Sequence, residues 1–242
     1  MYNLARFTYR EMMDCRATIR EMFTDAEPET VADGAEKIVR FLFENLVDDD
    51  GRPACALARM FKTHRYEALD GELRDFARKI EPNAEGIRDL RCLVLLATAG
   101  VEPAWNSRHE SRGHKCIPLA SEKMVEEAPM IAQLIKQIGL KISMVLRPDP
   151  ALMLTPEHAS YNVFYVPAAN GSPYIVAQEE FVRRCCIESV IGFGGLASAG
   201  DLLATILFTK VRIPREVAEF FKVIGLNARI AMLPLLRKPL FA

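Results

Sequence analysis

The stretch "WNSRHESRGHKCIPL", from Trp105 to Leu119, gathers side chains that could do chemistry. Two histidines, three arginine or lysine residues and one cysteine lie here between two apolar runs. Thiolate and imidazole groups suit zinc, iron or copper, whereas guanidinium and ammonium groups hold carboxylates and phosphates. The segment is therefore a candidate metal site, a candidate anion-binding loop or a solvated connection.

The metal interpretation takes His109, His114 and Cys116, with Cys92 or His158 as a fourth ligand. This spacing matches no zinc-finger pattern, and the chain has no Cys-x-x-Cys pair. Loops are polar by default, so a solvated loop is favoured. We predict no metal ligands, and a metal sensor built on this loop stays open as an alternative.

The anion interpretation uses Arg108, Arg112, His114 and Lys115, which could hold a carboxylate or phosphate by charge-assisted hydrogen bonds. Trp105 would supply an apolar wall with an N–H donor. Glutamates nearby could neutralise these charges, which would leave an ordinary surface loop. The loop is nevertheless our best candidate for a ligand-facing region.

Other sites depend on histidines or nucleophiles outside a recognised motif. A haem would need a proximal histidine on an apolar face, and the candidates, His64 and His158, lie in no apolar stripe. Cys116 with His114, or Ser160 with His158, could form a nucleophile and base. Sequence proximity does not establish that geometry, so we predict neither a catalytic residue nor an enzyme, and name no cofactor.

Adjacent cysteines, Cys185 and Cys186, follow Arg183 and Arg184. Neighbouring cations favour the thiolate and suggest a redox sensor. Consecutive residues of a helix point about 100° apart and rarely bond to each other. We expect one thiol to pack in the core and the other to be partly exposed.

Bulk composition narrows the class of protein. With 242 residues, 50% hydrophobic and 26% charged, the chain has a soluble globular composition and enough length for a core without disulfides. The net charge of −1 gives no field for nucleic acid or a membrane surface. No signal peptide or membrane-spanning run is expected, so we predict a cytoplasmic protein with mostly buried, reduced thiols.

Hydrophobic periodicity predicts an α+β domain. Helices are expected at 8–23, 31–46, 71–80, 121–139 and 177–184, and from Pro214 onward, with Val217, Phe220, Phe221, Ile224, Leu226 and Ile230 inward. Strands are expected at 54–61, 91–100 and 161–167, and in a hairpin around "ASAG". The glycines of "GFGGL" fit no phosphate loop and mark a close approach to the sheet or a bulge.

This order resembles the GAF domain, a ligand-sensing relative of PAS domains. The closing unit "IESVIGFGGLASAGDLLATILFTKVRIPREVAEFFKVIGLNARIAML" carries the resemblance. The segments "ALARMFKTHRYEAL", "RCLVLLATAGVEPAWNSRHESRGHKCIPL" and "YNVFYVPAANGSPYIVAQEEFV" are similar to an uncharacterised sensor module at the N-terminus of bacterial histidine kinases. The resemblance covers nearly the whole chain, so 1–242 is interpreted as one domain, with 1–47 as an added helical dimerisation segment.

The resemblance implies a six-stranded antiparallel sheet with helices on both sides. The terminal helices would pack together in a parallel homodimer, and the pocket would lie on the opposite face, under the loop Glu102–Pro118. Ordering that loop would shift the dimer between two arrangements. Because "LRKPLFA" carries no effector region, we expect either a free-standing sensor acting on a partner such as a histidine kinase, or an input domain.

The predicted ligand-binding residues come from the loop and from sheet positions taken as pocket walls. They are Trp105, Asn106, Arg108, Arg112, His114, Tyr165 and Phe193. On this interpretation Arg108→Ala weakens ligand binding without unfolding the protein. A pure interaction module, dimerising near Met22 and Phe221 with its pocket filled by its own side chains, is the remaining alternative.

Overall fold

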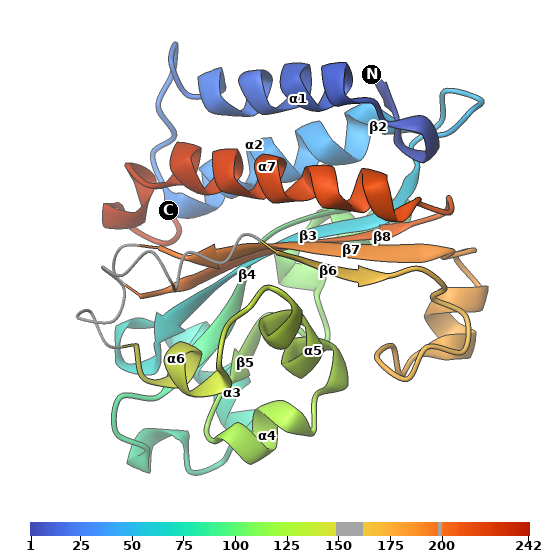
Figure 1. Cartoon of the computed structure of the whole chain (residues 1–242). Helices are drawn as coiled ribbons and strands as arrows, with labels where there is room; N and C mark the ends of the chain where they lie inside the picture. Colours follow the sequence, from blue (N-terminus) through green and yellow to red (C-terminus); the bar gives the residue numbers. More distant parts are fainter. Residues whose placement is uncertain (149–161, 198–199) are drawn as a thin grey trace.

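The computed structural model describes residues 1–148, 162–197 and 200–242. Its centre is a six-stranded antiparallel sheet in the order β5-β4-β3-β8-β7-β6 (Figure 1). The strands are β3 (Cys55–Arg65), β4 (Arg91–Gly100), β5 (Cys116–Pro118), β6 (Val163–Val166), β7 (Ser189–Leu196) and β8 (Leu202–Thr209). Two short parallel strands, β1 (Tyr2–Asn3) and β2 (Leu46–Val47), pair separately. The predicted six-stranded antiparallel sheet is confirmed.

Helices cover both faces of the sheet. They are α1 (Tyr9–Glu21), α2 (Val31–Asn45), α3 (Gly71–Ile80), α4 (Glu122–Glu126), α5 (Pro129–Gln137), α6 (Ile142–Leu146), α7 (Arg215–Met232) and a π-helix, Gln178–Arg183. Figure 1 shows α2 and α7 on one side of the sheet with α1 outermost, and α4 to α6 on the other side. Among the described residues, no helix is long and apolar enough to span a bilayer.

The two N-terminal helices each begin at a threonine N-cap. The hydroxyl of Thr8 accepts from the backbone N–H of Glu11, whose carboxylate accepts from the Thr8 backbone in return. Thr30 and Asp33 form the same reciprocal pair at α2. Such caps satisfy backbone donors that a helix start leaves free.

The helices of segment 1–47 share their core with the sheet and the closing helix. Ile19 of α1 and Ile38 of α2 are fully buried in the same cluster as Phe221 of α7. Helix α1 packs against α7, and α2 packs against β3 and β4. The predicted contact between the N-terminal and closing helices is confirmed.

The closing helix corrects one part of the sequence prediction. Val217, Phe221 and Ile224 are buried as expected, but Leu226 is only half-buried and Ile230 is 38% exposed. Each residue advances about 100° around a helix, so positions two and six after Ile224 turn away from the sheet. The true inward stripe continues through small residues of α7 and ends at Met232.

Glycines of β7 admit helices from both sides. A Cβ on Gly192 would lie 2.5 Å from a methyl carbon of Leu134 in α5, and one on Gly195 would lie 2.6 Å from the Arg229 guanidinium in α7. The expectation that "GFGGL" marks a close approach to the sheet is therefore confirmed, and the neighbours are helices.

A candidate ligand-binding cavity

A cavity of about 990 Å³ lies on the face opposite α2 and α7. The sheet contributes Leu57, Arg59, Phe61, Leu93, Ala204, Ile206 and Phe208 to its lining. The segment 102–119, helices α4 and α5, and residues 174–184 complete the wall. The cavity thus lies under the loop in which the sequence analysis placed the ligand.

Arg59 brings a charge to the floor of the cavity, where the other sheet residues are apolar. It lies in β3, where Leu57, Arg59 and Phe61 share one face because strand residues alternate. Its cross-strand partners are Thr98 in β4 and Ile206 in β8. β3 is an interior strand of the sheet, so its middle residue lies far from either edge.

A hydroxyl couples Arg59 to the loop. Arg59 Nε donates to Thr98 Oγ1 at 3.4 Å, and the same hydroxyl donates to the Trp105 carbonyl at 2.8 Å. Thr98 is 2% exposed, so this relay is shielded from water. The Thr98 hydroxyl therefore links the Arg59 guanidinium to the turn that carries Trp105.

Burial in the cavity lowers the pKa values of Arg59 and His114. Burial lowers the pKa of Arg59 to about 10, and no ion pair among the described residues offsets that burial. At neutral pH the guanidinium is still charged. Desolvation against the cavity wall, and then the charge of Arg59, lower the pKa of His114. His114 is therefore neutral at pH 7 and adds no second positive charge.

The loop is fastened to the end of β4. The Asn106 side chain accepts from the Gly100 N–H at 3.2 Å and donates to the carbonyls of Gly100 and Glu102 at 2.9 and 3.0 Å. A Cβ on Gly100 would lie 2.8 Å from the Trp105 Cβ. Trp105 then meets Phe181 edge-on at 5.5 Å. Asn106 positions the loop and does not line the cavity.

The basic residues of the loop do not converge on one point. Trp105, Arg112 and His114 line the cavity. Lys115 donates to a Glu72 carboxylate oxygen at 2.9 Å, and the Arg108 guanidinium stacks on Phe241 at 3.6 Å, outside the cavity. The expected four-residue anion site is therefore wrong: aromatic stacking holds Arg108, and a carboxylate satisfies Lys115.

Tyr165 and Phe193 lie on the other face of the sheet, which corrects their placement as pocket walls. Phe193 packs against Phe221 of α7 at 5.4 Å, and the Tyr165 hydroxyl donates to the carbonyl of Ile213. Side chains alternate along a strand, so the neighbour Phe164 faces the cavity side instead. Alternation along a strand separates its two faces, but it does not show which face packs against α7 and which lies on the cavity side.

The structure offers no metal cluster within the described residues, where no three His, Cys, Asp or Glu side chains gather. His109 lies near Glu72 at 3.9 Å. His64 Nδ1 contacts Lys62 Nζ at 3.2 Å, and burial lowers its pKa to about 4. His158 lies outside the described residues, so its haem and metal hypotheses have no structural placement here.

Cys116, the candidate nucleophile that the structure describes, is poorly placed for attack. Cys116 is fully buried, and its hydrogen bond with Cys92, together with burial, raises the pKa of its thiol far above the usual range. His114 instead lines the cavity. Ser160 lies outside the described residues. The raised pKa of Cys116 disfavours the thiolate that nucleophilic catalysis by cysteine needs.

The two adjacent cysteines differ in exposure, as predicted. Cys185 is half-buried and Cys186 is exposed, with φ +53°. Burial raises the pKa of Cys185. Burial also raises the pKa of the Cys15 and Cys55 thiols to about 12.

Limited alkylation tests that difference in exposure. We expect iodoacetamide to modify Cys186 at least about tenfold faster than any other described cysteine, since access and thiolate fraction both control the rate. Peptide mass spectrometry after a short exposure measures this, and Cys186→Ser should lose the fast adduct. Equally fast modification of buried Cys92 would contradict the arrangement.

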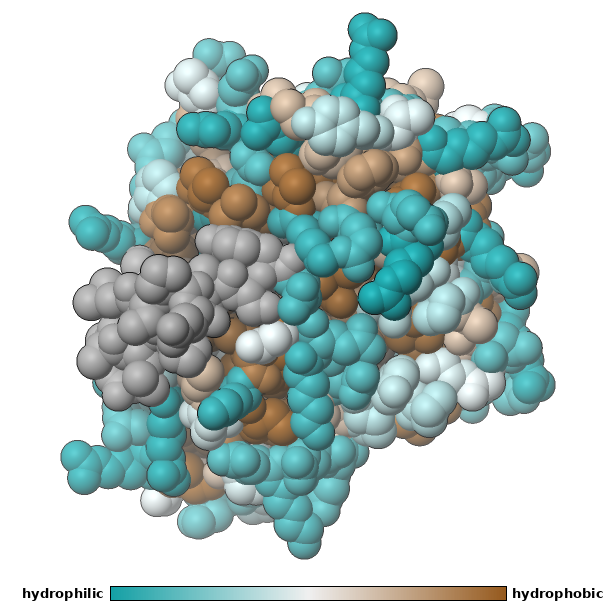
Figure 2. All heavy atoms as spheres, viewed as in Figure 1, coloured by the Kyte–Doolittle hydropathy of each residue, from teal (hydrophilic) through white to brown (hydrophobic). Residues whose placement is uncertain are grey.

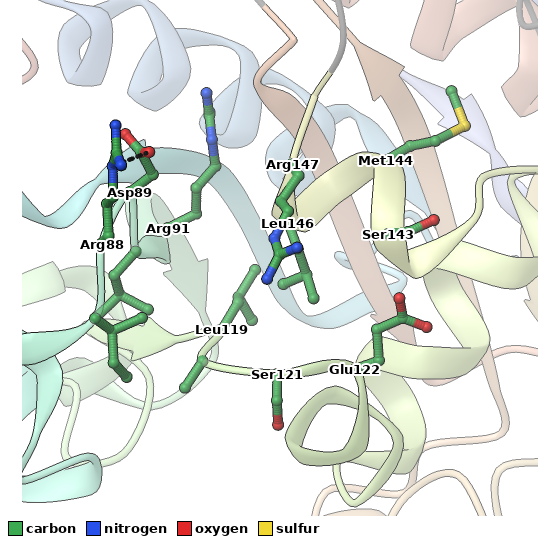
Figure 3. Close-up of a pocket in the computed structure, with 13 residues that line it drawn as sticks. Arg88, Asp89, Arg91, Leu119, Ser121, Glu122, Ser143, Met144, Leu146 and Arg147 are labelled. Carbon is green, nitrogen blue, oxygen red and sulfur yellow. Dashed lines mark ion pairs between the residues drawn. The ribbon is translucent and has the colours of Figure 1, made fainter.

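A second hollow of about 680 Å³ lies near the start of β4. Figure 3 shows Arg147 in its middle, with Arg88 and Arg91 on one side and Glu122 on the other. Arg88 lies 3.6 Å from Asp89, and Arg91 is paired with Asp201. Because these two arginines already have carboxylate partners, the larger cavity is the better candidate site.

Sequence reasoning missed Arg59. The signal was present as a lone arginine inside the apolar run "ACALARMF", which was interpreted only as a strand. A charged residue in a strand buried on both faces needs a partner or a function. Comparison of the chain with protein-family models, with curated proteins and with solved structures gave no match.

Proposed function

We propose that this chain is a GAF-like sensory or regulatory domain of a bacterial cytoplasm that binds a small organic ligand. The single observation that carries the proposal is the cavity of about 990 Å³ between the sheet and the segment 102–119. Ligand sites have volumes of roughly 300–1,000 Å³, with mostly apolar walls and a few fixed polar groups. This cavity has that size and that chemistry.

The cavity wall is connected to the terminal helices through the C-terminal segment. Arg108 belongs to the loop and stacks on Phe241. The preceding carbonyls, of Pro239 and Leu240, accept from the N–H groups of Val31 and Ala32 at the start of α2. A ligand that shifts the loop would thereby move residues bonded to α2, and this contact chain supports the proposed signalling route.

The second part of the proposal is a homodimer through α1 and α7. Tyr9 is 64% exposed, and Ile230 and Leu233 are 38% and 39% exposed. Figure 2 shows apolar surface at the level of α7. Phe221 is fully buried and Met22 half-buried, so the interface expected near these two residues moves to the outward side of both helices. A histidine kinase or another signalling protein would respond to the dimer.

The experiment that tests ligand binding is the mass of the gently purified protein under non-denaturing conditions, compared with its denatured mass. We expect a dimer with an excess per chain that matches a small organic molecule, released on denaturation. An excess matching a metal or haem would favour the metal-sensor alternative. A monomer or dimer without excess that also fails to take up added ligands would favour the interaction module.

A further inference from the structure

We infer that the ligand of this cavity is a monocarboxylate with an apolar body, and that the Arg59 guanidinium binds its carboxylate. This inference rests on the proposed function, because it names the chemical class that the proposed site takes. It follows from the position of one cation, from the character of the surrounding wall and from the charges at the rim.

Arg59 has unused hydrogen-bonding capacity. Only its Nε has a hydrogen bond to a described residue, the long one of 3.4 Å to Thr98. A guanidinium has five N–H donors in a fork that fits a carboxylate in two parallel bonds. Residues 57 to 61 of β3 hold Arg59 rigidly in the sheet, so the fork is ready before a ligand arrives.

The lining of the cavity favours a ligand that carries one negative charge on an apolar body. Leu57, Phe61, Ile206 and Phe208 surround Arg59 on the sheet side. An anion that neutralises a cation in such surroundings recovers free energy that a partnerless cation loses. A second negative charge would find no further cation on the floor. A linear or aromatic acid of moderate length therefore fits better than a phosphate ester.

The rim favours the same conclusion. Arg184 lies 3.5 Å from Glu102, so its charge is already offset. Arg112 is exposed, and Glu110 lies on the same rim. These groups leave the entrance with nearly balanced charge, which adds no attraction for a second negative charge on the ligand. Ser111, 7% exposed, has a hydroxyl with no hydrogen-bond partner among the described residues.

The chain provides its own reporter for a test. Trp105 is the single tryptophan and lines the cavity, so its fluorescence emission responds to occupancy. We would titrate the full chain at pH 7.5 with decanoate and, separately, with 1-decanol, which has the same apolar body without the charge. The same titrations on Arg59→Met remove the charge while keeping an apolar side chain of similar length. Arg212→Met makes the same change at an exposed arginine that lies 3.6 Å from Glu188 and does not line the cavity.

We expect decanoate to bind the native chain about tenfold or more tightly than decanol. Arg59→Met should remove this difference while leaving decanol binding unchanged, and Arg212→Met should behave as the native chain. Arg59→Lys should lie between them, because an ammonium cannot form the two parallel bonds. The decanoate to decanol ratio of the native chain needs no variant, so it tests the inference even if a variant fails to fold.

Equal binding of the two probes, unchanged in Arg59→Met, would overturn the carboxylate inference and leave the ligand-binding function standing. An equal loss in Arg212→Met and Arg59→Met would also overturn the role of Arg59. No response of Trp105 to either probe would overturn the inference, and a native mass without excess would then overturn the proposed function as well.

Discussion

Replacing Asp201 with asparagine is expected to lower the free energy of unfolding by about 3–5 kcal/mol, the cost of breaking a buried ion pair from one side. The Asp201 carboxylate pairs with Lys62 at 2.6 Å and also with Arg91. The side chains of these two cations are only 3% and 8% exposed. The change would leave two cations buried without a carboxylate. Urea denaturation followed by circular dichroism measures the loss.

The pH dependence of this variant follows from Lys62. Burial already lowers the pKa of Lys62, and the charge of Asp201 opposes that shift. In Asp201→Asn the folded state holds the lysine proton still more weakly, while the unfolded chain keeps the ordinary pKa. The unfolded state then binds more protons, so the stability of the variant should rise with pH up to the lysine range.

Two controls distinguish the effect of breaking a buried ion pair from the effect of removing a carboxylate charge. Asp49→Asn removes the exposed pair between Asp49 and Arg6, whose side chains are 57% and 74% exposed, and should cost far less stability than Asp201→Asn because water screens both charges. Adding Lys62→Met to Asp201→Asn should recover part of the stability, because one buried cation is removed. If both aspartate variants lose the same small amount, the buried cluster does not stabilise the sheet.

Replacing Gly194 with alanine is expected to cost about 2–5 kcal/mol, the sum of backbone strain and overpacking. Gly194 has φ +155°, and a Cβ there would lie 2.1 Å from the Leu203 carbonyl oxygen and 2.8 Å from the Ala204 Cα. Both contacts are with the backbone of β8, which is paired with β7 along its whole length. Neither strand can move aside without breaking that pairing.

The matched control for this substitution is Gly71→Ala. A Cβ on Gly71, at the start of α3, meets nothing within 4 Å, and its φ is ordinary. Alanine there should be neutral or slightly stabilising, by up to about 1 kcal/mol. Thermal unfolding of both variants checks the pair. A Gly194→Ala protein as stable as Gly71→Ala would contradict the close approach between β7 and β8.

Local sequence signals determined the elements of this protein. The helix predicted at 71–80 and the strand predicted at 91–100 have those bounds in the structure. Caps at Thr8 and Thr30 depend on residues three positions apart, and amphipathic periodicity depends on neighbours within a few turns. Interactions of this range can be recognised in the sequence, so periodicity predicted the α+β class and five of the six strands. The short strand β5 (Cys116–Pro118) gave no such signal, and the six-stranded antiparallel sheet was what the resemblance to the GAF domain implied.

The candidate site was predictable only in part. The loop under which the cavity lies, with Trp105, Arg112 and His114 in its wall, follows from polarity and position after a central strand. The roles of Arg108 and Lys115 do not, because their partners, Phe241 and Glu72, are distant in sequence. A basic side chain shows its charge in the sequence, but its partner becomes known only when the chain folds.

Tertiary structure decided which face of each strand meets the cavity. Shifting a strand by one residue exchanges its two faces, and β3 changes register against β4 between Met60 and Phe61. Arg59 lies on the cavity floor, whereas Phe193 and Tyr165 lie on the opposite side of the sheet. Sequence alone determined that these strands exist and where the polar loop begins. The side chains that the ligand would meet were determined by tertiary structure. Distant strands pair with one another, and α2 and α7 cover one face of the sheet, which leaves the other face to line the cavity.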